Sequence, residues 1–573
     1  MKEILKISII LTLLSLSSGA LAENYWQQYL RYNMDVTLNA EQKQLTGKQI
    51  IVYHNQSPDT LTDIYMHLYP NAFKNEQTLR SREGRRWYNQ PPQGLNRSWI
   101  DIDSFIISNG NSTSTDFRVD DTILHAPLAA PLAPGDSLII DLTFTHHLRQ
   151  HMGRAGYRGD HYDMAQWYPK VAVYDENGWD NDPWHYEGEF YGEFGDFQVT
   201  IQVPFNFIVG ATGVVTNGDP GWSDVQYNGS QNYSEWLKQY RSVQETIADI
   251  DKNRSVTFRA ENVHDFAWAT SPNFVYEYGS QGDTDIHVLY RYEQGSAWNT
   301  KTMNHAKSAL EWLESQFGEY AYPQVTVTHG LLGGGMEYPM LIMDGYVDEG
   351  LVVHEIGHIY FYGLLANDEM DAAWLDEGFT TFQERRYMIH HYGDEGRSLE
   401  EINYEYPGYL GFFPRESHYQ TMQNIIVDMQ LRGNNEALAK PAHAYGSEIS
   451  YVQNVYTKGA LMLWMLEYVM GEDAFWTGMR DYYETWQFKH VNEDRFRAVM
   501  AEHVDQNLDW FFDQWLHNTG YVDYGLTDIE SQQDGSGYST RVQFKRLGEF
   551  VMPLEVEVQS ANGASDRVFW FDQ

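Results

Sequence analysis

The segment from residue 351 to residue 378 constrains this chain more than any other. It contains the pattern H-E-x-x-H, in which His354 and His358 lie four residues apart. On an α-helix, side chains at this spacing share one face, with Cβ atoms about 5–6 Å apart. Nearly all the remaining positions around the two histidines are apolar, which predicts a buried helix. Because buried imidazoles need polar partners, the pattern predicts a metal site inside the fold.

The alternative is an amphipathic surface helix whose two histidines face solvent. A pattern as short as H-E-x-x-H also occurs by chance, so it does not decide the matter alone. The apolar neighbours Val352, Val353 and Ile356 leave such a helix without a polar face. The residues therefore favour the metal site.

Three protein ligands and one open position are usual for a catalytic zinc, with Zn–N bonds of about 2.0–2.1 Å. Glu377 can supply the third ligand. The residues after His358 allow a first helix to end near Leu365 and a second helix to begin near Ala372. Glu355 lies one step around the helix from the first histidine. That offset places its carboxylate beside the metal, where it suits a base acting on water.

Two further motifs accompany this pattern. They are G-G-M-E-Y at residues 334–338 and Y-T-K-G at residues 456–459. Glu377 lies within W-L-D-E-G, which continues the first pattern. With H-E-x-x-H they resemble, in order, the motifs of the gluzincin zinc aminopeptidases, the family of aminopeptidase N and leukotriene hydrolase. The resemblance covers residues 25 to about 525. There are two departures: Tyr338 replaces the Asn of G-x-M-E-N, and Asp376 replaces the Asn of W-L-N-E-G.

The resemblance implies a role for each motif. One zinc ion per chain would be held by the two histidines and Glu377, with Glu355 as general base. Tyr456 would donate a hydrogen bond to the oxyanion, and Glu337 would pair with the substrate α-ammonium. Gly334, Gly335 and Met336, which precede Glu337 in the same motif, would also contact the substrate. Gln166 lies in a region where relatives have a residue that reaches the substrate amine.

These roles predict a zinc-dependent aminopeptidase that removes N-terminal residues from peptides with a free N-terminus. Two other classes stay open. A zinc endopeptidase or an epoxide hydrolase could use the same zinc ligands and base. A non-catalytic peptide-binding scaffold would be expected to have a damaged metal triad, and here the triad is intact.

Composition and the N-terminus bear on location and partners. The net charge of −41 disfavours binding to nucleic acid or to an anionic membrane. Residues 1–22 have Lys2 and Lys6, a short apolar run and an A-x-A site, which predict a secretory signal peptide. The run is too short for a transmembrane helix, although an uncleaved anchor is the rival interpretation. With no cysteine in the chain, we expect an unlipidated bacterial protein that is periplasmic or secreted.

The predicted fold is multidomain. After the signal peptide at 1–22, residues 23–279 show alternating apolar positions and many turn residues, which predict an all-β, sandwich-like domain. Residues 280–525 predict an α+β catalytic domain of thermolysin type, with a polar insertion at 393–446. Residues 526–573 alternate again and predict a partial small β domain, with a hairpin turn at Asn562-Gly563.

Overall fold

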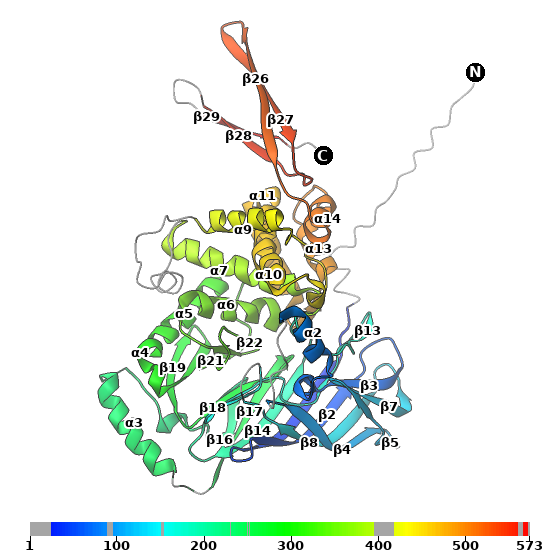
Figure 1. The fold of residues 1–573 in the computed structure, drawn as a ribbon, viewed down its shortest axis with the longest axis vertical. Helices are drawn as coiled ribbons and strands as arrows, with labels where there is room; N and C mark the ends of the chain where they lie inside the picture. Colours follow the sequence, from blue (N-terminus) through cyan, green and yellow to red (C-terminus); the bar gives the residue numbers. More distant parts are fainter. Residues whose placement is uncertain are drawn as a thin grey trace, which may run out of the picture.

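The computed structural model describes residues 25–88, 96–150, 154–229, 231–248, 250, 252–394, 417–559 and 565–570. Figure 1 shows a β-rich base, a mainly helical middle and a ribbon of strands at the opposite end. The predicted signal peptide lies outside the described residues. No helix within the described ranges is both long enough and apolar enough to cross a bilayer.

An eight-stranded sheet forms the base, in the order β16-β17-β14-β1-β2-β8-β4-β5. In β1, buried and exposed positions alternate as the sequence predicted, because one face of the sheet covers the core. Strand β1 pairs in parallel with β14 and antiparallel with β2. The strands are β1 (Tyr29–Asn39), β2 (Gln44–His54), β4 (Trp99–Asn109), β5 (Ser112–Ser114), β8 (Ser137–His147), β14 (Gly195–Pro204), β16 (Val214–Gly218) and β17 (Asn253–Val263).

Smaller sheets cover this base, in the orders β15-β18-β10-β9, β11-β3-β7-β6 and β12-β13. Their strands are β3 (Leu61–His67), β6 (Arg118–Asp120), β7 (Ile123–Leu132), β9 (Gly156–Arg158), β10 (His161–Met164), β11 (Lys170–Val171), β12 (Tyr174–Asp175), β13 (Gly178–Trp179), β15 (Ile208–Ala211) and β18 (Trp268–Ser271). The region also contains the helices η1 (Tyr69–Phe73), α2 (Leu79–Tyr88), η2 (Trp222–Asp224) and α3 (Tyr233–Ala248). Helix α3, which the prediction of an all-β domain missed, buries Trp236 and Tyr240 at a spacing of one helical turn.

A five-stranded sheet in the order β19-β20-β21-β23-β22 begins the catalytic region. Its strands are β19 (Phe274–Gln281), β20 (Thr284–Arg291), β21 (Gln324–His329), β22 (Glu337–Tyr338) and β23 (Leu341–Asp344). The predicted boundary at residues 279 and 280 falls inside β19. Short helices η3 (Tyr292–Gln294) and α4 (Gly295–Trp298) lead into α5 (Lys301–Gln316), which contacts β19 and α6.

The remainder of the catalytic region is mainly helical, as predicted. It contains α6 (Glu349–His358), η4 (Ile359–Leu364), β24 (Leu365–Asn367), η5 (Ala373–Leu375), α7 (Glu377–Tyr392), α9 (His418–Arg432), η6 (Ala442–Ala444), α10 (Glu448–Val452), η7 (Gln453–Lys458), α11 (Gly459–Met470), α12 (Glu472–Trp486), β25 (Lys489–Val491), α13 (Glu493–Ala501) and α14 (Asp509–His517). Helix α7 begins at Glu377, so the predicted start near Ala372 is wrong: a 3₁₀ turn precedes the helix. Residues 395–416 of the predicted insertion lie outside the described residues, and α9 follows them.

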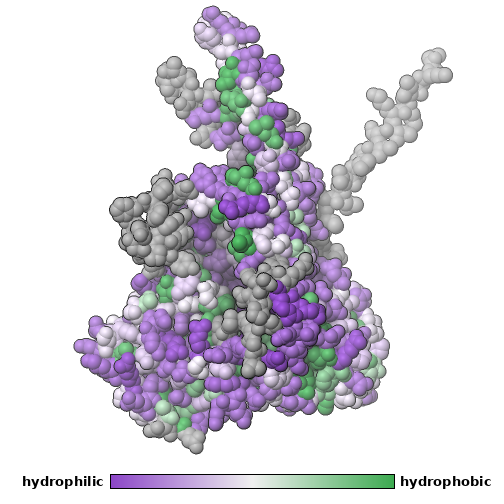
Figure 2. Space-filling view, in the orientation of Figure 1, coloured by the Kyte–Doolittle hydropathy of each residue, from purple (hydrophilic) through white to green (hydrophobic). Residues whose placement is uncertain are grey.

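Two hairpins end the chain: β26 (Tyr524–Asp534) with β27 (Gly537–Arg546), and β28 (Leu554–Gln559) with β29 (Ser565–Trp570). The predicted turn at residues 562 and 563 lies outside the described residues. Figure 2 shows hydrophobic side chains along this ribbon, on an otherwise largely hydrophilic face. Leu526 and Ile529 of β26 and Tyr538 of β27 are exposed. The three-part fold class predicted from sequence is confirmed.

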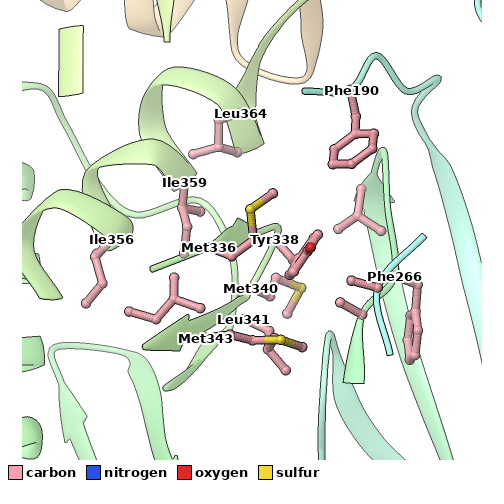
Figure 3. Close-up of a cluster of buried hydrophobic side chains, with 14 of the residues drawn as sticks. Phe190, Phe266, Met336, Tyr338, Met340, Leu341, Met343, Ile356, Ile359 and Leu364 are labelled. Atoms are coloured by element: carbon pink, nitrogen blue, oxygen red, sulfur yellow. The ribbon is translucent and has the colours of Figure 1, made fainter. Parts of the chain in front are cut away.

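The core beneath the site joins the base to the catalytic region. In Figure 3, Met336 and Tyr338 lie between Ile359 of the helical region and Phe190 and Phe266 of the base. All five side chains are at most 2% exposed. Burial on this scale, about 1.5–3 kcal/mol for each large apolar side chain, fixes strand β22 against both regions.

Candidate metal centre and its cavity

Helix α6 places the two histidines of H-E-x-x-H. The helix begins after Asp348, whose carboxylate accepts a hydrogen bond from the backbone N–H of Leu351 at 3.2 Å. This is an N-cap, and it satisfies one of the donors that a helix leaves unpaired at its start. His358 is the last residue of α6 and is buried, while the His354 side chain is 12% exposed. The histidines therefore face the interior, as the sequence predicted.

Helix α7 brings the third donor to the same point. The Nε2 atoms of His354 and His358 each lie 3.3 Å from Oε2 of Glu377. One donor atom from each of the three residues lies within 4.8 Å of the other two. The structure thus brings together the three predicted ligands, from the end of one helix and the first residue of the next.

Each histidine is oriented by a second carboxylate. Nδ1 of His358 donates to Oδ1 of Asp376 at 2.5 Å, and Nδ1 of His354 donates to Oε2 of Glu384 at 3.3 Å. A neutral imidazole that donates through Nδ1 presents its lone pair at Nε2. Carboxylates hold metal-binding histidines in this way and raise their basicity. Asp376, one of the two departures from the family motif, therefore acts on the orientation of a ligand.

The donor set fits a zinc ion. Two neutral imidazole nitrogens and a carboxylate oxygen are a common zinc ligand set, with one position left for water or substrate. Oε2 of Glu377 is buried and accepts no hydrogen bond from any described residue. An orphaned buried oxygen that faces two lone pairs is unfavourable unless a cation lies between them.

The charges around the site favour a cation at that point. Burial lowers the pKa of His358, but the carboxylates of Asp376 and Glu377 outweigh it and hold this pKa well above its usual value. Burial raises the pKa of Glu377, yet the imidazoles of His358 and His354 bring it below its usual value. Both shifts have one physical cause: the imidazoles and the carboxylates lie close together, so each stabilises the charged form of the other.

Glu355 lies beside the predicted metal position. Its side chain is buried, lines the cavity, and has one oxygen with no hydrogen-bond donor among the described residues. A Cβ at Gly335, just before β22, would lie 2.0 Å from Oε1 of Glu355, so any side chain at this position would displace the Glu355 carboxylate. Burial raises the pKa of Glu355, which suits a group that accepts a proton near neutral pH.

The strand with the motif G-G-M-E-Y contributes unequally to the cavity. Gly334, Gly335 and Glu337 line it, and Oε1 of Glu337 is buried with no hydrogen-bond donor among the described residues. Met336 does not line it: its side chain packs in the core of Figure 3. In an extended strand, neighbouring side chains point to opposite faces, so Met336 supports the strand while Glu337 faces the cavity.

Tyr456 reaches the metal centre from η7. Its hydroxyl donates a hydrogen bond to Oε1 of Glu377. Its ring lies nearly parallel to that of His354, with centroids 6.2 Å apart. Tyr451 is also buried, but it does not line the cavity. The structure therefore places the predicted tyrosine, and not its neighbour, within reach of a group bound at the metal.

The cavity around these residues has a volume of about 520 Å³. Several of its lining residues were not predicted from sequence: Arg154, Glu189, Leu332, Tyr346, Asp348, Gly350, Leu351, Glu384, Arg385 and Met388. Gln166 does not line it. Its Oε1 accepts from the hydroxyl of Tyr338 at 3.2 Å, and its Nε2 donates to Asp265 at 3.1 Å. Tyr338, the other departure from the family motif, thus holds Gln166 away from the site.

Comparisons with known proteins agree with this geometry. The model of the peptidase family M1 domain matches residues 301–515. The leukotriene A-4 hydrolase of Xenopus laevis is 23% identical over 228 residues, which cover 37% of this chain and 35% of the relative. Aminopeptidase B of Mus musculus is 24% identical over 268 residues, covering 43% of this chain and 38% of the relative. The chain spans only about a third of the length of the curated relatives that it matches.

The similarity to solved structures is broader. An M1 zinc metallopeptidase from Deinococcus radiodurans superposes with a TM-score of 0.57 at 13% identity, over 86% of this chain and 94% of that one. A mutant of that enzyme bound to a Tyr-Ser-Ala substrate gives a TM-score of 0.56. At this identity the likeness establishes the fold.

The fold and the converging donors together define a zinc-metallopeptidase-like domain. More specifically, residues 301–515 match the peptidase family M1 domain, in agreement with the family resemblance of the three motifs.

Proposed function

We propose that this protein is a zinc-dependent aminopeptidase that removes residues from peptides with a free N-terminus. One observation carries the proposal. The cavity that contains the two histidines and Glu377 also contains Glu337, whose buried carboxylate oxygen has no donor among the described residues. A buried carboxylate that close to a hydrolytic centre suits the α-ammonium of a peptide whose first bond is cleaved.

In this proposal the chain holds one zinc ion through His354, His358 and Glu377. The ion supplies Lewis acidity, which polarises the scissile carbonyl and makes water more acidic. Glu355 accepts the proton of the attacking water and delivers it to the leaving amine. Tyr456 turns its hydroxyl from Glu377 to the developing oxyanion. Such a donor, aimed at charge that grows in the transition state, accelerates the reaction.

N-acetylation of the substrate tests the proposal. A charge-assisted hydrogen bond between Glu337 and the α-ammonium is worth roughly 1.5–3 kcal/mol, or about ten- to a hundredfold in kcat/KM. An acetylated peptide loses that bond and leaves a buried carboxylate unpaired. We expect kcat/KM to fall nearly to background for the acetylated partner of each peptide pair. Equal cleavage of both would overturn the aminopeptidase proposal in favour of a zinc endopeptidase.

Location and partners follow from the sequence. The signal peptide predicted at residues 1–22 supports export to the periplasm or the medium, and the net charge of −41 argues against a nucleic-acid partner. Edman sequencing of protein recovered outside the cytoplasm should start at Glu23. Recovery of an intact N-terminus in the membrane fraction would favour an uncleaved anchor.

A further inference from the structure

We propose that Lys458 is a positioning residue for Tyr456: its amine fixes the helical turn that aims the Tyr456 hydroxyl at the metal centre. This inference rests on the oxyanion role that the proposed function gives to Tyr456. Both residues belong to the motif Y-T-K-G, but only the tyrosine has a role so far. Lys458 does not line the metal cavity; it lines a separate pocket of about 980 Å³ whose walls include α9 and α11. It therefore acts on the reaction only through other residues.

The turn that contains Tyr456 is the π-helical segment η7, between α10 and α11. Turns of this kind are rare, and they are frequent at functional sites. Around a helix, residues four apart share a face, whereas residues two apart do not. Asn454 and Lys458 are four apart, and Tyr456 lies midway between them. The two buried side chains Asn454 and Lys458 therefore face away from the metal centre while Tyr456 faces it.

The amine of Lys458 ties this turn to two other parts of the chain. Its Nζ donates to Oδ1 of Asn435 at 2.9 Å and to the carbonyl oxygen of Glu436 at 2.7 Å. A third hydrogen bond reaches the carbonyl oxygen of Asn518 at 3.3 Å. An ammonium group has three N–H donors, so all three have acceptors here. Lys458 thus joins the end of η7 to the segment after α9 and to the end of α14.

Asn454 makes a second connection to the same segment. Its Oδ1 accepts from the backbone N–H of Glu436 at 2.9 Å, and its Nδ2 donates to the carbonyl oxygen of Asn434 at 2.7 Å. Nδ2 also donates to the carbonyl oxygen of Ser450, one turn earlier, at 2.8 Å. The outer face of η7 is therefore held at both ends against residues 434–436.

The inner face of the turn is held by a contact between two glycines. A Cβ at Gly459 would lie 2.9 Å from Cα of Gly378, and a Cβ at Gly378 would lie 3.1 Å from Cα of Gly459. Gly378 directly follows Glu377, whose Oε1 accepts the hydrogen bond from Tyr456. The backbones of α7 and α11 therefore touch beside that hydrogen bond. Tyr456 is held between this contact and the anchors on residues 434–436.

Burial makes Lys458 costly to charge. It lowers the pKa of Lys458 to about 7, and the carboxylate of Glu436 opposes the shift only in part. The three acceptors are two carbonyl oxygens and one amide oxygen, so none of them is a charge partner. An amine whose charged form burial disfavours adds little to stability. What its three directed hydrogen bonds supply is the position of η7.

The test is a double-mutant cycle of Lys458→Met and Tyr456→Phe, with kcat and KM measured on a free-amine peptide. Methionine keeps most of the length of the lysine side chain and removes its three donors. We expect Lys458→Met to lower kcat about ten- to a hundredfold, because a small displacement of a catalytic group is costly, and to change KM little. In the Tyr456→Phe background there is no hydroxyl to aim, so the same substitution should lower kcat by less than about twofold.

Lys440→Met is the matched control. Its Nζ also bonds to the segment 434–436, through Oε2 of Glu436, but Lys440 does not belong to η7. We expect its kcat to stay within about twofold of wild type, as for an ordinary surface ion pair. Zinc content and circular dichroism show whether each variant is folded. If Lys458→Met does not fold, Asn435→Ala removes one acceptor of the amine and should give a smaller fall in kcat that again disappears in the Tyr456→Phe background.

The outcomes separate this inference from the function on which it rests. If Tyr456→Phe keeps the kcat of wild type, the oxyanion role of the tyrosine itself fails. If Tyr456→Phe lowers kcat but Lys458→Met behaves like Lys440→Met, only the role of Lys458 is overturned. Equal factors of loss for Lys458→Met in the two backgrounds would overturn it as well, because they would show that the lysine acts independently of the Tyr456 hydroxyl.

Discussion

The molecule buries carboxylates in two neighbouring places, and their partners differ. In the base, Asp265 has a complete set of donors. Its Oδ1 accepts from Tyr168 at 3.0 Å and from the backbone N–H of Phe266 at 2.7 Å. Its Oδ2 accepts from Gln166 at 3.1 Å and from Lys170 at 3.2 Å. A buried charge paired this fully needs nothing from outside the protein.

In the cavity, by contrast, several carboxylates lack hydrogen-bond donors for one of their oxygens. One oxygen each of Glu189, Glu337, Glu355 and Glu377 has no hydrogen-bond donor among the described residues. Native proteins leave few buried polar atoms unpaired, so a group of them in one cavity marks where ligands complete the structure. The comparison teaches that burial alone does not mark a ligand site, whereas several unpaired carboxylate oxygens that line one cavity do.

The largest effect should come from Glu355→Gln, which replaces a carboxylate that has one unpaired oxygen with a neutral amide. If this group moves the proton, kcat should fall by about 10²–10⁴-fold or more. Zinc content and the unfolding midpoint should stay as in wild type, since the residue ligates nothing. Steady-state kinetics beside metal analysis provide the check. Activity within tenfold of wild type would show that the base lies elsewhere.

Tyr456→Phe should have the next largest effect. The hydroxyl donates to Glu377 at rest and to the oxyanion in the transition state, so its loss should lower kcat about 10²–10³-fold and change KM little. Tyr451→Phe is the matched control, because this buried tyrosine does not line the cavity. A larger loss of kcat in the control would reassign the oxyanion donor.

Asp265→Asn breaks the complete network and should act on stability instead. It leaves the buried ammonium of Lys170 without its charge partner, which typically costs about 3–5 kcal/mol. We expect the free energy of unfolding to fall by an amount of that order in urea titrations, while the folded fraction keeps its zinc. A loss below about 0.5 kcal/mol, within the range of ordinary surface substitutions, would mean that the network contributes little.

A smaller effect should appear in the pH dependence of stability. Burial lowers the pKa of His264, which is next to Asp265, from 6.5 to about 3. Above pH 6.5 the residue is neutral in both states. As the pH falls from 6.5 towards 3 the unfolded chain binds a proton that the folded protein does not, so stability is lost at about 1.4 kcal/mol per pH unit.

Replacing this histidine tests the sign and the cause. Between pH 6 and pH 4, His264→Gln should lose less stability on acidification than wild type, as measured by chemical unfolding at each pH. Identical slopes for the two proteins would exclude His264 as a source of the acid sensitivity.

Much of the metal centre could be predicted from sequence, because its residues lie in contiguous patterns on regular elements. The spacing of His354 and His358 on one helix specifies their common face, and Glu377 follows at the start of the next helix. The prediction that helix α7 starts near Ala372 was wrong, because a 3₁₀ turn at Ala373–Leu375 precedes it.

The rest of the cavity could not be predicted because it depends on long-range contacts. Glu189 and Arg154 come from irregular segments of the base, and no local pattern indicates that they reach the metal centre. Strand alternation could have shown that Met336 faces away from Glu337, and helical spacing in residues 233–248 could have revealed α3. The hydrogen bond from Tyr338 to Gln166 joins residues far apart in the chain, so only the three-dimensional structure reveals it.

The central claim is that one metal ion binds the donor atoms of His354, His358 and Glu377, whereas the hydrogen-bond network of Asp265 in the base needs no ion. Zinc content per chain, measured on purified wild type, His358→Ala and Asp265→Asn after identical dialysis, tests it most directly. The account predicts one zinc in wild type, none in His358→Ala, and one in the folded fraction of Asp265→Asn. A His358→Ala protein that keeps one zinc would contradict it.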